Sequence, residues 1–461
     1  MASIYRSRLG AFVARFFAGC FIVLLAVYLY VLAVNSRDRP PTAVATQMRA
    51  LIEQRPQVPA EDNAYLFVLG VRAPDDIDPR EAGKSRLAWI ESRGYAEGAS
   101  TPDPLPTNHL RQDRPKHIHQ LIHTCRPMAA ACVAEVEATL PAIAEWLSPD
   151  ELTLVRYQQL LEHPAWLESI APDYDAPLPN YEDILDGQRL YFVALRELSL
   201  RGQTDAVRER LEKDIRFWRM VLRSADTILV KAIAATALHA HFASSMFAFK
   251  ALPVNERERA IPASWSEEIS VEERSIRRAL AGELMLIDRT YSATEEGDLL
   301  EKRSSEKGII WRAVYNAFMY FYQHQDAHNR IASDLDALAR AFEGPLSEYA
   351  EQRSRFAQEP TQRVLDWLYN PIGDYLFQTA ASVFREYTVR FGDIEGVRRA
   401  ALLTARLRAS GVTAENIEER LRESSLRNPY TNEPFEWNAA DGTVEFVGLG
   451  NGKAGRQGFV L

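Results

Sequence analysis

The sequence predicts a mainly α-helical protein with an N-terminal transmembrane helix, an irregular body of helical hairpins or a solenoid, and a small C-terminal β-hairpin. Three observations carry this prediction: an uncharged apolar segment near the N-terminus, helical periodicity over most of the chain, and alternating residues near the C-terminus. With 461 residues, of which 47% are hydrophobic and 25% charged, the chain can bury a large core.

The apolar segment runs from Phe16 to Val34 without a charged residue. As a helix it would span roughly 28 Å, which is close to the hydrocarbon thickness of a bilayer. Arginine residues without an acidic residue precede it, at positions 6, 8 and 15. This bias predicts a cytoplasmic N-terminus at 1–15, a single span at 16–34 in a bacterial inner membrane, and a periplasmic body.

A cleaved signal peptide is the alternative interpretation of this segment. Its apolar core should be about 7–15 residues long and should end in a small-x-small site. The core here is longer, and the only site, around Ala33, is poor. The sequence therefore favours a retained anchor.

Cysteine usage agrees with export. Cys20 lies inside the apolar segment, and Cys125 and Cys132 are seven residues apart. Two cysteines in an exported domain suggest a disulfide. Pro127 suits the first turn of a new helix, so Cys125 can lie in the preceding turn and fold back onto Cys132. Two small buried thiols remain the other interpretation.

The composition along the chain divides it into four further segments. Residues 35–62 form a polar, proline-bearing tether with a short helix around Met48, and residues 63–135 an irregular cap that contains the cysteine pair. Residues 136–427 form the helical body, and residues 428–461 the β-hairpin and tail.

Within the body, residues 188–225 show apolar residues at three- and four-residue steps on both sides of Gly202, which is expected to end the first of two helices. Residues 228–252 are apolar on nearly all sides, so this helix should be central. Residues 376–411 are expected to form another hairpin with its turn near Gly392.

The C-terminal segment has alternation in "FEW" and "VEFV" on either side of Asp441 and Gly442. Because glycine tolerates positive φ, Asp-Gly between two alternating runs predicts a β-hairpin.

Two resemblances accompany these patterns. Residues 188–225 are similar to a tetratricopeptide-like helix pair. The C-terminal segment resembles that of pseudopilin-like exported proteins, although Asn432 and Glu433 replace the usual small-residue turn. The matching residues are Asn428, Pro429, Tyr430, Thr431, Pro434 and Phe435. The whole chain looks like proteobacterial inner-membrane proteins with one span and a helical periplasmic body, which implies location and fold but no activity.

Two histidine pairs are candidate metal ligands. His119 and His123 are four residues apart and close to Cys125, but a thiol in a disulfide cannot also bind metal, and a histidine-rich surface helix is the simpler interpretation. His324 and His328 form the second pair.

The second pair lacks the glutamate that directly follows the first histidine in zinc proteases, because Gln325 stands there. Apolar residues larger than alanine are missing from 323 to 330. This gap predicts a polar joint between two helices, with a break at Gln325 or Asp326 and Asp326 as the N-cap. One continuous helix over 309–342 would instead favour a metal site.

The net charge of −9, the isoelectric point near 5.6 and the absence of a long basic run argue against a nucleic-acid partner. No complete catalytic or cofactor motif occurs, so no cofactor is expected. The favoured function is a non-catalytic, membrane-anchored periplasmic binding or scaffold protein with a protein or peptide partner. The alternative is an envelope hydrolase that acts on glycan or lipid through paired carboxylates or a metal.

Overall fold

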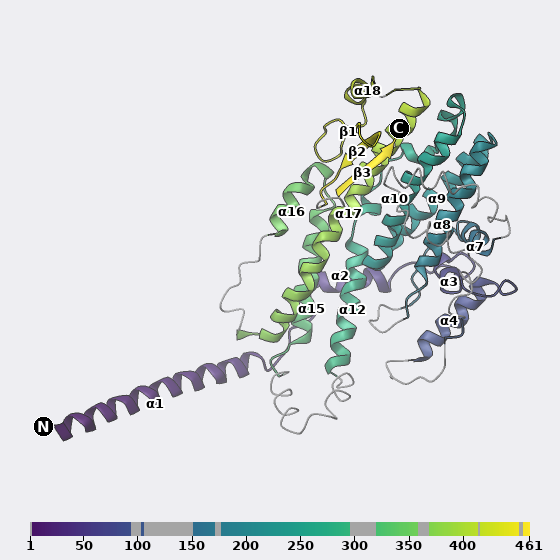
Figure 1. Ribbon diagram of the computed structural model, residues 1–461. Coiled ribbons are helices and arrows are strands. Elements are labelled where there is room, and N and C mark those ends of the chain that lie inside the picture. Colours follow the sequence, from purple (N-terminus) through teal and green to yellow (C-terminus); the bar gives the residue numbers. More distant parts are fainter. Residues whose placement is uncertain are drawn as a thin grey trace. The chain divides into compact units, whose positions relative to one another are not determined.

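The computed structural model describes residues 2–93, 103–105, 151–170, 177–295, 320–357, 368–413, 415–450 and 455–461. Within these ranges the protein is mainly helical, with fourteen α-helices and one small three-stranded antiparallel sheet (Figure 1). The mainly α prediction is therefore confirmed.

The helices up to the middle of the chain are α1 (Ala2–Val34), α2 (Ala43–Glu53), α3 (Ala64–Leu69), α4 (Pro79–Arg93), α7 (Leu152–Leu160), α8 (Tyr181–Leu200), α9 (Thr204–Ser224) and α10 (Ile228–Ala251). The later elements are α11 (Val271–Arg274), α12 (Arg277–Glu295), α15 (His324–Ala341), α16 (Tyr349–Ala357), α17 (Pro371–Ala409), α18 (Ile417–Glu423), β1 (Glu436–Asn438), β2 (Thr443–Val447) and β3 (Arg456–Val460). Four short 3-10 helices lie in the described ranges: Val254–Glu256, Glu258–Ala260, Ala263–Ser266 and Leu346–Glu348.

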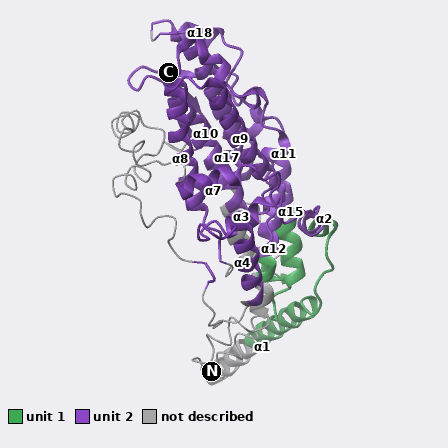
Figure 2. Ribbon diagram, turned by 90° about the vertical axis from the view of Figure 1, so that its right-hand side faces the viewer, with its two compact units in different colours: residues 1–47, 287–334, 358–383 green, residues 48–286, 335–357, 384–461 purple. Residues whose placement is uncertain are grey.

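The chain forms two compact units (Figure 2). Unit 1 consists of residues 1–47, 287–334 and 358–383, and unit 2 of residues 48–286, 335–357 and 384–461. Each unit is therefore assembled from segments that are far apart in the sequence.

Among the residues that the structure describes, two helices are long and apolar enough to cross a membrane. Residues Arg15–Val34 of α1 have a mean hydropathy of 2.6 and none of them is buried, as expected of a membrane anchor or a signal sequence. The second, α10, has a mean hydropathy of 1.2 and is 61% buried. It packs against α8 and α9 in unit 2, which confirms the prediction of a central helix.

The helix pair predicted over residues 188–225 is present as α8 and α9. Gly202 follows the end of α8 with a φ of +68°, a left-handed conformation in which a side chain would be strained. The resemblance to tetratricopeptide repeats stays a prediction.

A buried polar network links the central helices of unit 2. Asp214 on α9 is fully buried and accepts hydrogen bonds from Tyr157, Gln188 and His241. His241 Nδ1 lies 2.7 Å from this carboxylate, while its Nε2 accepts a bond from the indole of Trp265 at 2.9 Å. Both ring nitrogens of His241 are therefore engaged inside the core, so this Asp–His pair is a structural network.

The hairpin predicted over residues 376–411 is wrong, because α17 continues unbroken from Pro371 to Ala409. Gly392 lies inside this helix. A Cβ atom there would be 2.7 Å from the ring of Tyr349 and 2.8 Å from the hydroxyl of Tyr430. Gly392 therefore allows two aromatic side chains to approach the helix closely, and it does not mark a turn.

The C-terminal hairpin is confirmed. β1 pairs antiparallel with β2, with Trp437 opposite Val444, and Gly442 has a φ of +62° in the turn. The structure adds β3, which pairs antiparallel with β2 and which the sequence did not predict. Only Phe459 of this strand is fully buried, so it lacks a strong alternating pattern.

The residues that follow α1 do not run free of the folded chain. Residues 35–42, expected within the tether, hydrogen-bond to other segments of unit 1, and α2 follows at the position where a short helix was expected.

Cys125 and Cys132 lie outside the described residues, so the disulfide stays a prediction. Cys20 is a free, exposed thiol on α1.

Replacement of Asp214 by alanine should lower the free energy of unfolding by about 3 kcal/mol or more, because it removes a buried acceptor that three side chains share. Asp205 lies on the same helix but its side chain is 67% exposed, so Asp205→Ala should cost less than about 1 kcal/mol. Urea unfolding of the detergent-solubilised protein measures both. Equal losses in the two variants would contradict a structural role for the network.

The pKa of Asp393 on α17 predicts a pH dependence. Burial raises this pKa from 3.8 to about 6, although hydrogen bonds from the Tyr430 hydroxyl and the Leu449 amide partly offset the effect. An unfolded aspartic acid loses its proton near pH 4, whereas the folded one keeps it until about pH 6. Stability should therefore fall by roughly 3 kcal/mol as the pH rises across this window.

Asp393→Asn keeps an acceptor for both donors and does not titrate. The difference in unfolding free energy between Asp393→Asn and the unaltered protein should change from pH 4 to pH 6 and stay constant above it. A constant difference over the whole range would show that the carboxyl is not perturbed.

Candidate functional site

His324 and His328 lie on one helix. The break expected at Gln325 or Asp326 is wrong in position, because α15 begins at His324 and both histidines belong to it. Asp326 lies in the first turn of the helix and is not its N-cap. The four-residue spacing therefore places both imidazoles on the same side of α15.

The cap of α15 comes from the segment that follows α1. The carboxylate of Asp38 accepts hydrogen bonds from the backbone N–H groups of Gln325, at 2.6 Å, and Asp326, at 3.0 Å. These are two of the N–H groups that a helix start leaves without an internal acceptor. Asp38, which precedes Gln325 by 287 positions, therefore caps the helix in place of Asp326, the N-cap that the sequence predicts.

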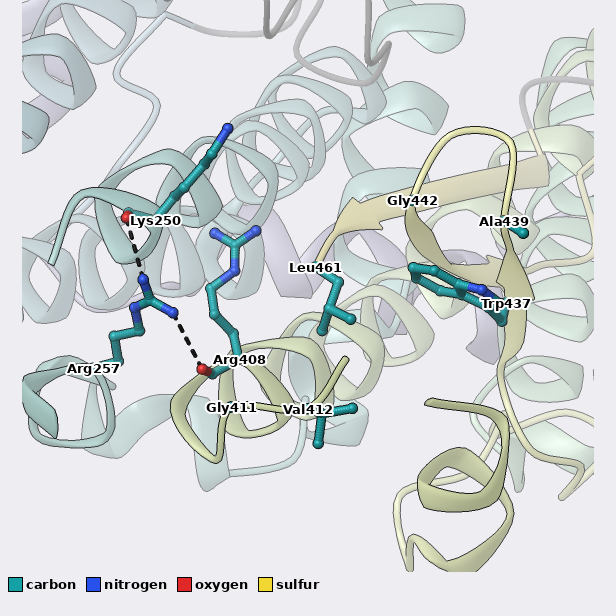
Figure 3. A pocket seen from close by; sticks show the side chains of 9 residues that line it. All are labelled: Lys250, Arg257, Arg408, Gly411, Val412, Trp437, Ala439, Gly442 and Leu461. Atoms are coloured by element: carbon teal, nitrogen blue, oxygen red, sulfur yellow. Dashed lines mark hydrogen bonds between the residues drawn. The ribbon is translucent and has the colours of Figure 1, made fainter. Parts of the chain in front are cut away.

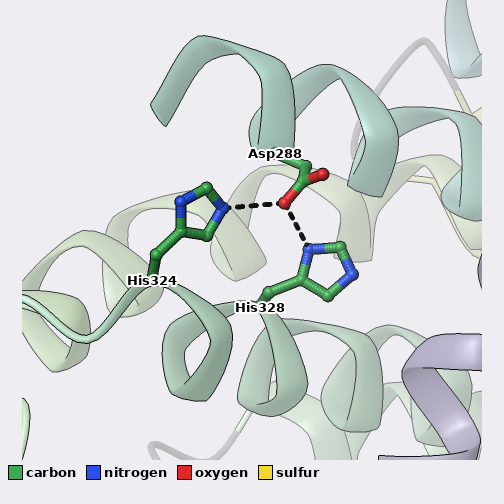
Figure 4. Close-up of side chains that lie close together, drawn as sticks. All are labelled: Asp288, His324 and His328. Carbon is green, nitrogen blue, oxygen red and sulfur yellow. Dashed lines mark hydrogen bonds and ion pairs between the residues drawn. The ribbon is translucent and has the colours of Figure 1, made fainter. Parts of the chain in front are cut away.

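Both histidines meet one carboxylate, that of Asp288 on α12 (Figure 4). Asp288 Oδ1 lies 2.8 Å from His324 Nε2 and 2.9 Å from His328 Nδ1. The three candidate ligand atoms all lie within 4.8 Å of one another. The side chain of His328 is 5% exposed, whereas those of His324 and Asp288 are 21% and 25% exposed.

Electrostatics keep Asp288 ionised. Burial raises the pKa of its carboxyl, but hydrogen bonds from His324 and His328 lower it more, so that this pKa lies well below its usual value. The cluster therefore presents a negative charge together with two imidazole nitrogens. That is a ligand set for a divalent cation of the zinc class.

Sequence reasoning missed Asp288, which is 36 residues from His324. Its one local signal is an acidic residue that follows the apolar stretch "LMLI" on a predicted helix. The other histidine pair, His119 and His123, lies with Cys125 outside the described residues.

A buried polar junction surrounds the start of α15. Asn35, directly after α1, is 2% exposed and donates to the carbonyl of Leu368 at 2.8 Å. Its side-chain oxygen accepts from the amide of Asn370, and its carbonyl accepts from the side chain of Gln323. Asn370 in turn donates to Asp326 Oδ2 at 3.1 Å. The end of α1 is thereby joined to the turn that carries His324.

Two further contacts strengthen this junction. Arg39 Nη1 lies 2.9 Å from Asp326 Oδ1, and its guanidinium lies 4.5 Å from the ring centre of Tyr369. Asn329 accepts from the amide of Thr42 and donates to the carbonyl of Pro40. The polar residues of the predicted joint are thus used for contacts with residues 35–42 and 368–370.

A basic pocket of about 470 Å³ lies in unit 2 (Figure 3). Its lining contains three basic residues and no acidic side chain. The lining residues are Lys250, Arg257, Arg408, Gly411, Val412, Trp437, Ala439, Gly442 and Leu461. Arg257 is held by bonds to the carbonyls of Leu252, Lys250 and Arg408, which orient it without adding negative charge. The pocket suits an anionic group beside an aromatic ring.

Substitutions of Asn370 should separate backbone strain from hydrogen bonding. Asn370 is fully buried with a φ of 54°, and its side-chain oxygen accepts from the amides of Gln323 and Gly373. Asn370→Gly should cost about 2 kcal/mol, because both amides lose their acceptor. Asn370→Ala should cost about 1 kcal/mol more, because alanine also resists this conformation.

Thermal unfolding of the two variants in detergent measures this difference. If the two melting temperatures coincide, the left-handed conformation at Asn370 is not maintained.

No family model, curated protein or solved structure matches this chain. Its function therefore has to be inferred from its own residues and their geometry.

Proposed function

We propose that this chain is a non-catalytic binding or scaffold protein of the bacterial cell envelope, anchored by residues 16–34 in the inner membrane. Its body is an irregular assembly of helical hairpins that lies in the periplasm. The observation that carries the proposal is the junction at the end of α1, where Asn35, Asp38 and Arg39 hydrogen-bond to the folded unit.

This junction favours a retained anchor over a cleaved signal peptide. A signal peptide is normally followed by a segment that a peptidase can reach in an extended form. Asn35 is buried directly after α1, two residues from the poor cleavage site around Ala33. A scaffold attached in this way would transmit the position of the membrane helix to unit 1.

Orientation follows from the charges that flank α1. Arg6, Arg8 and Arg15 precede the apolar segment without an acidic residue, while Asp38 lies between Arg37 and Arg39 after it. This bias favours a cytoplasmic N-terminus and a periplasmic body.

The basic pocket supports a binding role. Lys250, Arg257 and Arg408 come from three different segments and surround one cavity with Trp437 at its side (Figure 3). Trp437 is half-buried, and cationic side chains beside such a ring are complementary in charge to an acidic segment of a partner protein. We therefore propose a protein partner that inserts an acidic segment into this pocket.

Charge reversal at the pocket tests the partner directly. Lys250 is exposed on α10, so Lys250→Glu should leave the fold intact. Proteins cross-linked in native membranes and purified with the tagged chain should include one that is depleted at least tenfold by Lys250→Glu. Lys84→Glu, an equal charge reversal on the exposed face of α4, should leave that protein unchanged.

Two outcomes would contradict the proposal. The first is a set of cross-linked proteins that is identical for both variants and the unaltered chain. The second is release of the body from membranes by carbonate extraction, since a retained span resists that treatment.

A metal-dependent envelope hydrolase is a second candidate, because two imidazoles and one carboxylate leave a coordination position where water could be activated. Hydrolysis of glycan strands or phospholipid vesicles by zinc-loaded protein, abolished by Asp288→Asn, would favour this candidate over the first. The basic pocket plays no part in it.

A further inference from the structure

We infer that Asp288, His324 and His328 bind one divalent cation of the zinc class, with a further coordination position left to water. The inference rests on the geometry of unit 1 and is independent of the proposed binding role. The ion would join α12 to the first turns of α15.

The ligand types select the class of metal. Imidazole nitrogen is a ligand of intermediate softness that suits zinc, copper, nickel and iron, whereas magnesium and calcium prefer sites made only of oxygen. Asp288 adds a hard, charged oxygen that offsets half of the ion's charge. Two histidines and one carboxylate are a common protein ligand set for Zn²⁺.

The distances are compatible with a bound ion after a small adjustment. Ligand atoms about 2.1 Å from zinc in a tetrahedral arrangement lie roughly 3.4 Å apart. Asp288 Oδ1 now lies 2.8 Å from His324 Nε2 and 2.9 Å from His328 Nδ1. An ion therefore requires these atoms to separate by about 0.5 Å, which small rotations of the side chains can supply.

The protonation states also permit binding. A neutral imidazole carries one N–H, and in the hydrogen-bonded cluster this group points at Asp288. When the ion binds, that proton moves to the other ring nitrogen, so the inward nitrogen offers its lone pair.

The surroundings hold the ligands in place and leave an entry path. Asp38 and Arg39 fix the first turn of α15, which carries His324. His328 is nearly buried, while His324 and Asp288 keep about a fifth to a quarter of their side-chain surface exposed. Solvent can therefore reach the cluster from the side of His324 and Asp288, which suits a water ligand in the open position.

Metal titration of the full-length protein in detergent, after removal of metals with a chelator, tests the inference. Calorimetry should show one equivalent of Zn²⁺ bound, and Co²⁺ should give the intense visible absorption of a four-coordinate site with nitrogen and oxygen ligands. Asp288→Asn and His328→Gln should each weaken Zn²⁺ binding at least roughly 100-fold, because loss of a group that only supports a ligand already costs about 10- to 100-fold. Millimolar Mg²⁺ or Ca²⁺ should not compete.

His163→Gln is the matched control, since His163 lies in unit 2 and bonds only to backbone carbonyls near the end of α7 among its described contacts. It should bind Zn²⁺ like the unaltered chain. Zn²⁺ should raise the melting temperature of the unaltered chain and of His163→Gln but not of His328→Gln. The metal-free melting temperature of each variant shows whether it is folded.

The inference is overturned if folded, metal-free protein binds no stoichiometric Zn²⁺, or if His328→Gln binds it as tightly as His163→Gln does. In that case the cluster is a carboxylate hydrogen-bonded to two histidines. Neither result bears on the cross-linked partner of the proposed function, so the two proposals fail separately.

Discussion

The hydrogen bonds from the start of α15 to Asp38 are the constraint on which unit 1 depends. A helix start exposes N–H groups that need acceptors, and inside a folded protein an unpaired one is costly. Asp38 supplies the acceptor for Gln325 and Asp326. This fixes where α15 begins, places His324 and His328 on the same helix, and brings the end of α1 into the folded unit.

The same principle explains why the junction is polar although it is buried. The junction is formed by hydrogen bonds among Asn35, Gln323 and Asn370. Each side chain thereby regains, inside the protein, hydrogen bonds that it would otherwise make to water. Such a network specifies one arrangement of its members, since any shift leaves a buried donor unpaired. Apolar packing alone would hold the end of α1 less specifically.

The parts of the fold that could be predicted from the sequence are those that local patterns determine. The apolar span, the α8–α9 pair with Gly202, the central α10 and the hairpin around Gly442 all follow from the periodicity and turn chemistry of consecutive residues. The site could not be predicted, because Asp38 and Asp288 reach α15 from distant segments. The turn predicted near Gly392 is wrong for a related reason. The absence of a side chain at Gly392 allows Tyr349 and Tyr430 to approach α17 closely, and these contacts come from residues distant in the sequence.

The segment after α1 caps α15 and thereby determines the geometry of the cluster. Hydrogen exchange of the backbone amides at residues 324–329, compared between Asp38→Ala and Asp38→Asn in the full-length protein, tests it most directly. Asparagine keeps one of the two acceptor oxygens, since Asp38 Oδ2 serves Gln325 and Oδ1 serves Asp326, whereas alanine keeps neither. Exchange should therefore be faster in the alanine variant than in the asparagine variant, with residues 335–341 unaffected in both. Identical exchange in both variants would contradict it.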